Sequence, residues 1–206
     1  MHKGDYYLQF AEAVYQWQKA QLLREDGVYA DMRGGCRDCR VAYEEVDGVR
    51  FRAHTPLPNQ VGRAYSYNSG TMLSGAADLY RVTGNPTYLT DLKTLGQHSF
   101  NYFARLGKEV PGYYSYDVSG FSNWFNGVLL RGWVDASPWD DQAAGYIQTF
   151  QQNLDYGYEH HLYQGFLPHN LLRGWDDGWR QVEGMFAFAF AAEYAVLARY
   201  TLEKSN

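Results

Sequence analysis

A pair of helices separated by a sharp break constrains the fold of this chain more than any other feature. Residues 67–82 are rich in small side chains, which let a neighbouring helix approach closely. Gly84 suits the left-handed conformation that commonly ends a helix. Asn85 then predicts an N-cap, with Pro86 at the first position of a second helix. The segment therefore predicts an αα-hairpin whose boundaries are set by local residue types.

Helical periodicity extends along most of the chain, and the expected helices alternate in character. Those at 67–82, 121–134 and 182–202 are apolar over most of their surface, whereas those at 5–24, 86–106 and 140–157 keep a polar side. This alternation is expected of inner and outer helices in a toroid of αα-hairpins. Residues 4–8 echo residues 84–89, a weak internal repeat that places Met1 in the middle of a hairpin. We expect an all-α fold, with residues 1–206 forming one domain, an incomplete (α/α)6 toroid of about six or seven helices.

Residues 67–89 also resemble glycoside hydrolase family 76, the endo-α-1,6-mannanases. In that family a Tyr-Asn-x-Gly-Thr stretch opens a helix that continues into small residues, Leu-Tyr, Thr-Gly and Tyr-Leu. Weaker echoes lie at residues 26–31 and 124–131. The resemblance covers nearly the whole chain, but only about the second half of the family's catalytic domain. It implies an α-mannan ligand and a secreted or cell-surface location.

The predicted alternation gathers polar and aromatic side chains at one face of the toroid. The loops that lead into the inner helices must open on the same face, together with the unpaired N–H groups of those helices. Carboxylates, amides and aromatic rings on a concave face are typical of a sugar cleft. The predicted glycan-binding residues are Asp31, Tyr67, Asn68, Trp124, Trp175 and Trp179. The alternative interpretation is that Asn68 and Asn123 cap helices and that the Trp side chains fill the core.

The chain differs from the family mainly at the positions of the family's catalytic residues. The resemblance implies a retaining mechanism in which two adjacent Asp residues, upstream of the Tyr-Asn-x-Gly stretch, serve as nucleophile and acid/base. Here no Asp-Asp pair occurs before residue 140. Asn126 is a second departure, because the family commonly has Lys at that position. The chain is therefore expected to lack the family's catalytic pair.

Two Asp-Asp pairs occur downstream. Asp140 and Asp141 are expected to begin an outer helix, where carboxylates interact favourably with the helix dipole. Asp176 and Asp177 lie between two Trp residues on the expected cleft face. Adjacent carboxylates repel, and one can then keep its proton and act as an acid. Asp176 and Asp177 are the only catalytic candidates in the chain, although helix entry or sugar contact is the preferred reading.

Other site classes find little support in the sequence. A net charge of −5 without charge runs does not favour nucleic-acid binding. The longest wholly apolar run, residues 185–192, is too short to span a bilayer. Cys36 and Cys39 form a lone CxxC without a second ligand pair, and the histidines lack metal-ligand spacing, so neither a metal site nor a cofactor is predicted.

Three functions remain compatible with these patterns. The first is a relative of α-mannan hydrolases that keeps part of a glycan cleft but does not cleave glycan alone. The second is a non-enzymatic carbohydrate-binding or oligomerising module, which would cover its apolar inner helices by self-association or by pairing with a separate N-terminal half. The third is a different six-hairpin sugar enzyme that uses Asp176 or Asp177.

Overall fold

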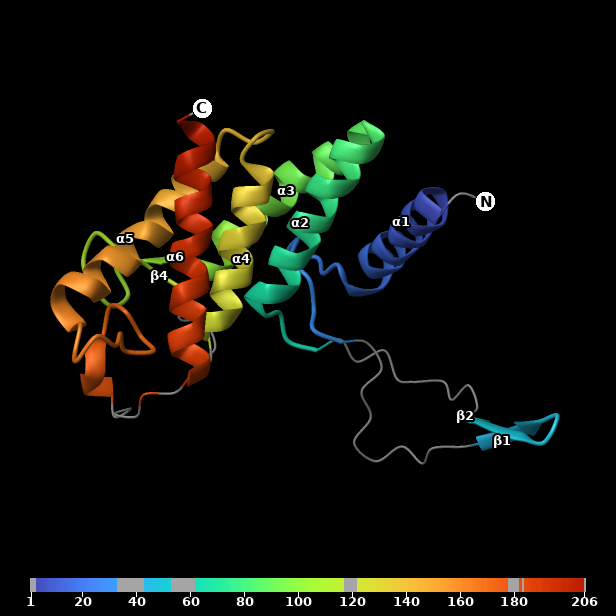
Figure 1. Cartoon of the computed structure of the whole chain (residues 1–206), viewed down its shortest axis with the longest axis horizontal. Helices are drawn as coiled ribbons and strands as arrows, with labels where there is room; N and C mark the ends of the chain where they lie inside the picture. Colours follow the sequence, from blue (N-terminus) through green and yellow to red (C-terminus); the bar gives the residue numbers. More distant parts are fainter. Residues whose placement is uncertain are drawn as a thin grey trace.

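The computed structural model describes residues 3–32, 43–52, 62–116, 122–177, 182 and 184–205, and these form a two-layered arc of helices. The helices are α1 (Lys3–Leu22), α2 (Ser66–Thr83), α3 (Pro86–Phe103), α4 (Ser122–Ala136), α5 (Ala143–His161) and α6 (Gly184–Lys204). α2, α4 and α6 run side by side in the same direction, and α1, α3 and α5 belong to the other layer (Figure 1). The predicted inner and outer sets are therefore confirmed.

Two pairs of short antiparallel strands lie in the connections between the described helices. β1 (Tyr43–Val46) and β2 (Val49–Arg52) pair antiparallel through an Asp-Gly turn, and both turn residues, Asp47 and Gly48, have positive φ. β3 (Arg105–Leu106) and β4 (Tyr114–Ser115) form a second antiparallel pair, and β3 takes up the last residues of the expected helix 86–106, because α3 ends at Phe103. The pairing satisfies backbone groups between α3 and α4 that a loop would leave to solvent.

The break between α2 and α3 has the predicted chemistry. Gly84 adopts the left-handed conformation, with φ of 67°, and its N–H donates to the carbonyl of Tyr80 at 2.8 Å. The Asn85 side chain caps α3, because its Oδ1 accepts a hydrogen bond from the backbone N–H of Thr87 at 3.0 Å. Pro86 is the first residue of α3. Local residue types therefore fix where one layer ends and the other begins.

Glycines set the close packing of α2 on α4. A Cβ atom on Gly132 would lie 2.6 Å from the backbone oxygen of Gly70, so a larger residue there would force the two helices apart. Around this contact Leu73, Leu129 and Trp133 are fully buried. The small residues of the inner helices thus do what the sequence predicted, which is to let the helix backbones approach.

Side-chain hydrogen bonds and an ion pair join α1 to its outer neighbour α3. Lys19 forms an ion pair with Asp91 at 2.6 Å, and the Tyr15 hydroxyl donates to the same carboxylate at 3.1 Å. The Tyr88 hydroxyl donates to Glu12 at 2.9 Å. The apolar residues of α1 at Tyr7, Phe10, Val14 and Trp17 are nevertheless exposed, so α1 is not the ordinary half-buried surface helix that its periodicity indicates.

α6 lies at the other end of the arc and packs one side on α4. Its buried side chains include Phe186, Phe190 and Leu197. Glu193 is also fully buried there, its carboxylate oxygens have no hydrogen-bond partner among the described residues, and burial raises its pKa well above the usual value. Among the described helices α6 alone is long and apolar enough to cross a membrane by length and composition, a test that core helices also pass.

Candidate functional site

The three inner helices present their N-termini at one end of the arc. In Figure 1 the starts of α2, α4 and α6 lie toward the bottom, and the short 3-10 helix η1 (Gly174–Asp177) lies at the same end of the arc. Each start brings backbone N–H groups without helical partners and the positive end of a helix dipole to this face. The predicted common face is confirmed, and it favours polar or anionic groups.

Asp31 reaches this face because two distant segments pair at the base of a long connection. The backbone N–H of Asp31 donates to the carbonyl of Arg63 at 2.9 Å, and the N–H of Gly62 donates to the carbonyl of Met32 at 2.7 Å. Ala30 and Ala64 form an isolated antiparallel bridge next to them. The returning chain enters α2 within a few residues, which places Asp31 beside the first turn of that helix.

Asp31, Tyr67 and Asn68 form a hydrogen-bonded cluster. The Tyr67 hydroxyl and Asn68 Nδ2 both donate to Asp31 Oδ1, the latter at 3.3 Å. Asp31 Oδ2 receives no hydrogen bond from the described part of the chain. Burial, the hydrogen bond to Asp31 and the charge of that carboxylate raise the pKa of Tyr67 to about 12, so the phenol stays a donor at neutral pH. Asn68 thus orients Asp31, whereas Tyr65 occupies the N-cap position of α2 without a side-chain hydrogen bond.

Aromatic rings continue the site from this cluster toward α4. Tyr67 lies between Tyr65 and Trp124 in a row of nearly parallel rings, with interplanar angles of 7° and 8° and centroid distances of 5.9 Å. Phe125 packs edge-on against Tyr67 at 4.6 Å. Trp124 keeps 37% of its surface exposed, so part of the row remains accessible to a ligand. Such rings combine flat apolar faces with polar edges, as sugar recognition requires.

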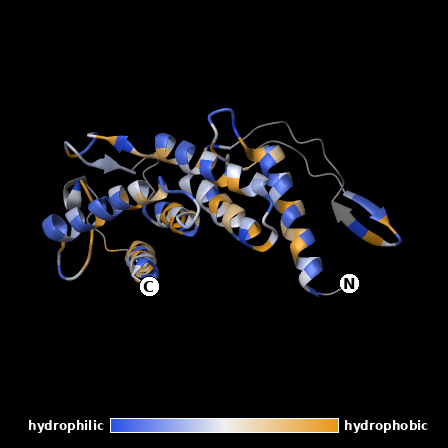
Figure 2. Ribbon diagram, turned by 90° about the horizontal axis from the view of Figure 1, so that it is seen from above, coloured by the Kyte–Doolittle hydropathy of each residue, from blue (hydrophilic) through white to orange (hydrophobic). Residues whose placement is uncertain are grey.

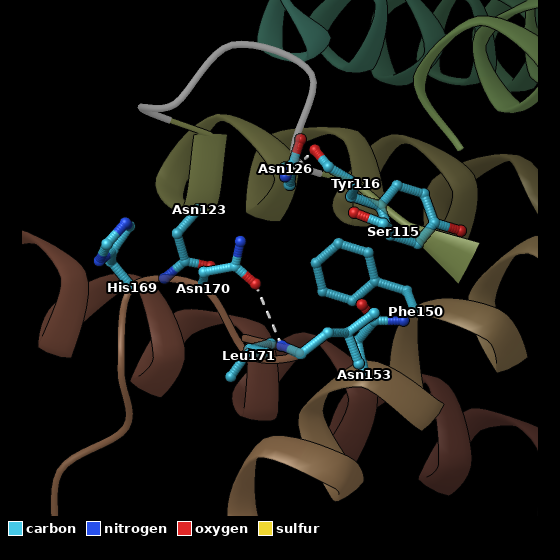
Figure 3. A pocket seen from close by; sticks show the side chains of 10 residues that line it. Ser115, Tyr116, Asn123, Asn126, Phe150, Asn153, His169, Asn170 and Leu171 are labelled. Carbon is cyan, nitrogen blue, oxygen red and sulfur yellow. Dashed lines mark hydrogen bonds between the residues drawn. The ribbon is translucent and has the colours of Figure 1, made fainter. Parts of the chain in front are cut away.

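A small polar pocket lies between α4, α5 and the segment before η1. Figure 3 shows Asn123, Asn126, Asn153 and Asn170 converging on it, with Tyr116 and Phe150 at one side. Its volume of about 40 Å³ exceeds what a single water needs. Nδ2 of buried Asn123 has no hydrogen-bond partner among the described residues, which leaves one donor in the pocket for a water or a sugar hydroxyl.

Asn126 has a different role in the same region. Its Oδ1 accepts from the Ser66 hydroxyl at 2.7 Å, and its Nδ2 donates to the carbonyl of Tyr116 at 2.9 Å. The side chain therefore ties the start of α2 to the start of α4. Sequence reasoning missed Asn153 and Asn170 as pocket residues, because no local signal marks an amide that is brought in from another helix.

The other predicted binding residues lie on η1 or beyond it. Trp175 is half-buried, donates from Nε1 to the carbonyl of His161 at 2.7 Å and packs edge-on against Tyr163 at 6.3 Å. It thus fastens η1 to the end of α5, while Asp31, Tyr67, Asn68 and Trp124 come together elsewhere.

The downstream Asp pairs differ in what the structure describes of them. Asp176 and Asp177 belong to η1, but their side chains lie outside the described residues, as do Trp179, Cys36 and Cys39. Asp140 is buried and accepts from the backbone N–H of Gln142 at 3.2 Å, so it caps the turn that leads into α5, close to its predicted place. In the described segments, no group of three or more His, Cys, Asp or Glu side chains could hold a metal ion.

The family model of glycosyl hydrolase family 76 matches residues 1–111, which is more than half of the chain and includes the Asp31 cluster. The chain belongs to glycosyl hydrolase family 76. The match contains the Tyr-Asn-x-Gly-Thr stretch that opens α2, so the resemblance noted in the sequence is confirmed.

Solved structures extend the likeness over the remaining residues. A family 76 mannosidase from Bacteroides thetaiotaomicron superposes with a TM-score of 0.70 at 19% identity, covering 100% of this chain and 51% of that one. A family 76 enzyme from a bovine strain of that species gives 0.68 at 20% identity, with 96% and 39% covered. A Salegentibacter α-1,6-mannanase, inactivated by replacing two adjacent aspartates and bound to α-1,6-mannotetrose, gives 0.59 at 20% identity, with 92% and 52% covered.

These likenesses establish the fold of the family for this chain, an α/α toroid of which it forms a part. The chain spans about half the length of the solved structures that it matches. No curated protein matches it.

Proposed function

We propose that this chain is a glycan-binding half of a family 76 domain, which binds α-1,6-linked mannan oligosaccharides and does not hydrolyse them on its own. The observation that supports this proposal is the hydrogen-bonded cluster of Asp31, Tyr67 and Asn68, with partly exposed Trp124 stacked on Tyr67. A pyranose that packs on the exposed part of Trp124 would lie near the polar groups of this cluster. The binding of α-1,6-mannotetrose and α-1,6-mannotriose by a family relative supports the choice of ligand.

The absence of hydrolysis is proposed from the distribution of carboxylates. Glycoside hydrolysis with retention needs two carboxyl groups about 5–5.5 Å apart. Before Tyr67 the sequence has only isolated aspartates, and Asp31 is engaged by two donors. The relative that lost two adjacent aspartates is described as inactive yet still holds its oligosaccharide. A chain without that pair would resemble it in binding without turnover.

Affinity for α-1,6-mannotetraose, measured by isothermal titration calorimetry, tests the binding surface. Trp124→Ala removes the open aromatic face, and a loss of about 1 kcal/mol of ring contact would weaken binding roughly fivefold. Tyr158→Ala is the matched control, since Tyr158 is an exposed aromatic side chain on α5 that belongs to neither the cluster nor the ring row. Equal affinities of the two variants would refute the proposed surface.

Asp176 and Asp177 remain catalytic candidates for the alternative of a different sugar enzyme. They adjoin Trp175 at the inner-helix face, which is the only support for that assignment. Multiple turnovers by the pure chain, abolished in Asp176→Asn or Asp177→Asn, would establish this alternative and overturn the proposal of a non-hydrolytic half.

A further inference from the structure

Four dipeptides of this chain carry an Asp or Asn directly before a Gly, at residues 26–27, 47–48, 126–127 and 177–178. In such a pair the backbone nitrogen of the Gly can attack the side-chain carbonyl carbon of the preceding residue, since no Cβ crowds its approach. The product of this attack is a cyclic succinimide. The structure describes both residues of the first three pairs and places them in different surroundings.

Asp47 and Gly48 form the tip of the hairpin β1–β2, which projects away from the helices in Figure 1 and Figure 2. Both residues are exposed and have positive φ, as a two-residue hairpin turn requires, and a Cβ on Gly48 would meet nothing within 4 Å. Among the described residues no ion pair or hydrogen bond holds the Asp47 carboxylate, and the N–H of Gly48 has no backbone partner. The attacking nitrogen and the carboxyl group are therefore both free to react.

Asp26 and Gly27 lie in a turn that engages both reacting groups. Nε of Arg24 donates to Oδ1 of Asp26 at 3.0 Å, and Nη2 donates to Oδ2 at 2.7 Å. The hydrogen bonds to Arg24 lower the pKa of Asp26, and an ionised carboxylate is the poorer electrophile. The N–H of Gly27 donates to the carbonyl of Arg24 at 3.0 Å, and a Cβ on Gly27 would collide with the ring of His98. Ring closure here has to break these contacts first.

Asn126 and Gly127 are held inside α4. The buried Asn126 side chain is bonded to the Ser66 hydroxyl and to the carbonyl of Tyr116. The nitrogen of Gly127 lies within the helix, where a backbone N–H donates to the carbonyl four residues earlier. A succinimide at this position would require the first turns of α4 to unwind.

We propose that Asp47 is a site of spontaneous isomerisation to isoaspartate in the folded protein, whereas Asp26 and Asn126 are protected by the fold. The nitrogen of Gly48 bonds to Cγ of Asp47, and the carboxyl OH leaves with the amide hydrogen as water. A second water then opens the succinimide. When it adds to the α-carbonyl carbon, the bond from that carbon to the nitrogen breaks, and Gly48 stays joined through Cγ.

The reaction changes the turn without changing the composition of the protein, since one water is lost and one is regained. Isoaspartate adds one carbon to the main chain between β1 and β2. Val46 and Val49, the pair that closes the ladder next to the turn, would then lose their register. The former α-carboxylate becomes a free side-chain carboxylate at the tip of the hairpin.

Peptide mapping of the 206-residue protein, kept for several weeks in solution at pH 6, tests the proposal. Trypsin releases residues 25–33 and 41–50 as separate peptides, and electron-transfer fragmentation distinguishes isoaspartate from aspartate in each. The isoaspartate fraction should be roughly tenfold or more higher in 41–50 than in 25–33, because Asp26 must first break charged hydrogen bonds. Asp47→Glu should abolish isoaspartate in 41–50, whereas the matched control Asp26→Glu should leave it unchanged.

The same map after incubation in guanidinium chloride separates the effect of the fold from that of the local sequence. In the unfolded chain the protection is lost, and Asn126 should become the fastest site, because an amide releases ammonia more readily than a carboxylate releases its oxygen. A 41–50 peptide that stays free of isoaspartate in the folded protein would overturn the proposal. So would an order of reactivity that is the same in the folded and the unfolded chain. Neither readout involves a glycan, so the result is independent of the proposed binding function.

Discussion

Replacing Glu193 by Gln should make the stability of this protein less dependent on pH. Glu193 lies fully buried between α6 and α4, and neither carboxylate oxygen has a hydrogen-bond partner in the described structure. A Cβ on Gly127 would lie 3.0 Å from its Oε1, so the site is too tight for a hydration shell. Burial therefore raises the pKa of the folded carboxyl well above the usual 4.5.

The sign and size of the effect follow from linkage. Below pH about 4.5 the carboxyl is protonated in both the folded and the unfolded chain, so its ionisation contributes nothing to the free energy of unfolding. Above that pH the unfolded chain loses the proton first. The free energy of unfolding then falls by about 1.4 kcal/mol for each pH unit until the folded pKa is reached. For a chain of this size that is about 3–6 °C in Tm per pH unit.

Thermal unfolding followed by circular dichroism between pH 4 and pH 8, at one protein concentration, measures this effect. Tm of Glu193→Gln should fall less steeply with pH than Tm of the unaltered protein, and the gap between them should widen as the pH rises. Glu203→Gln is the control, because Glu203 is an exposed carboxylate on the same helix. A Tm difference that stays constant across the pH range would refute a buried, protonated Glu193.

Three further changes probe the fold and the site. Gly132→Ala should lower the free energy of unfolding by about 1–3 kcal/mol through overpacking of α2 against α4, whereas Gly145→Ala on α5, where a Cβ meets nothing, should not; urea denaturation compares them. Asn85→Ala should cost about 1 kcal/mol in the same assay, because α3 loses its N-cap. Tyr67→Phe removes one hydrogen bond to Asp31 and should cost about 0.5–1.5 kcal/mol; an unchanged midpoint would contradict that contact.

The sequence predicted those parts of the structure that depend on local residue types. Gly84, Asn85 and Pro86 act within one turn of the chain, and their roles were correct. The alternation of apolar and half-polar helices predicted the two layers, since each helix records how much of its surface is buried. The neighbourhood of Asp31 and Tyr67 was also anticipated, because a common face for the inner-helix N-termini follows from the alternation alone.

Features that depend on partners distant in sequence could not be predicted in this way. Nothing near Glu193 indicates a buried carboxylate, because Gly127 comes from another helix. Asn153 reaches the polar pocket only because α5 packs beside α4. α1 carries apolar residues at helical spacing, yet Phe10 is exposed, because α1 meets α3 through other side chains, Glu12, Tyr15 and Lys19. In each case the local sequence indicates whether a side chain is polar or apolar, but it does not indicate which other helix the side chain contacts.

Incubation of the pure chain with α-1,6-mannotetraose, with binding followed by ligand-observed NMR and cleavage by the appearance of new reducing ends, tests the central claim most directly. We predict saturation transfer to the oligosaccharide, reduced in Trp124→Ala, and no new reducing ends after prolonged incubation. Multiple turnovers by the unaltered chain, or no transfer to the oligosaccharide at all, would contradict a glycan-binding half without the catalytic pair.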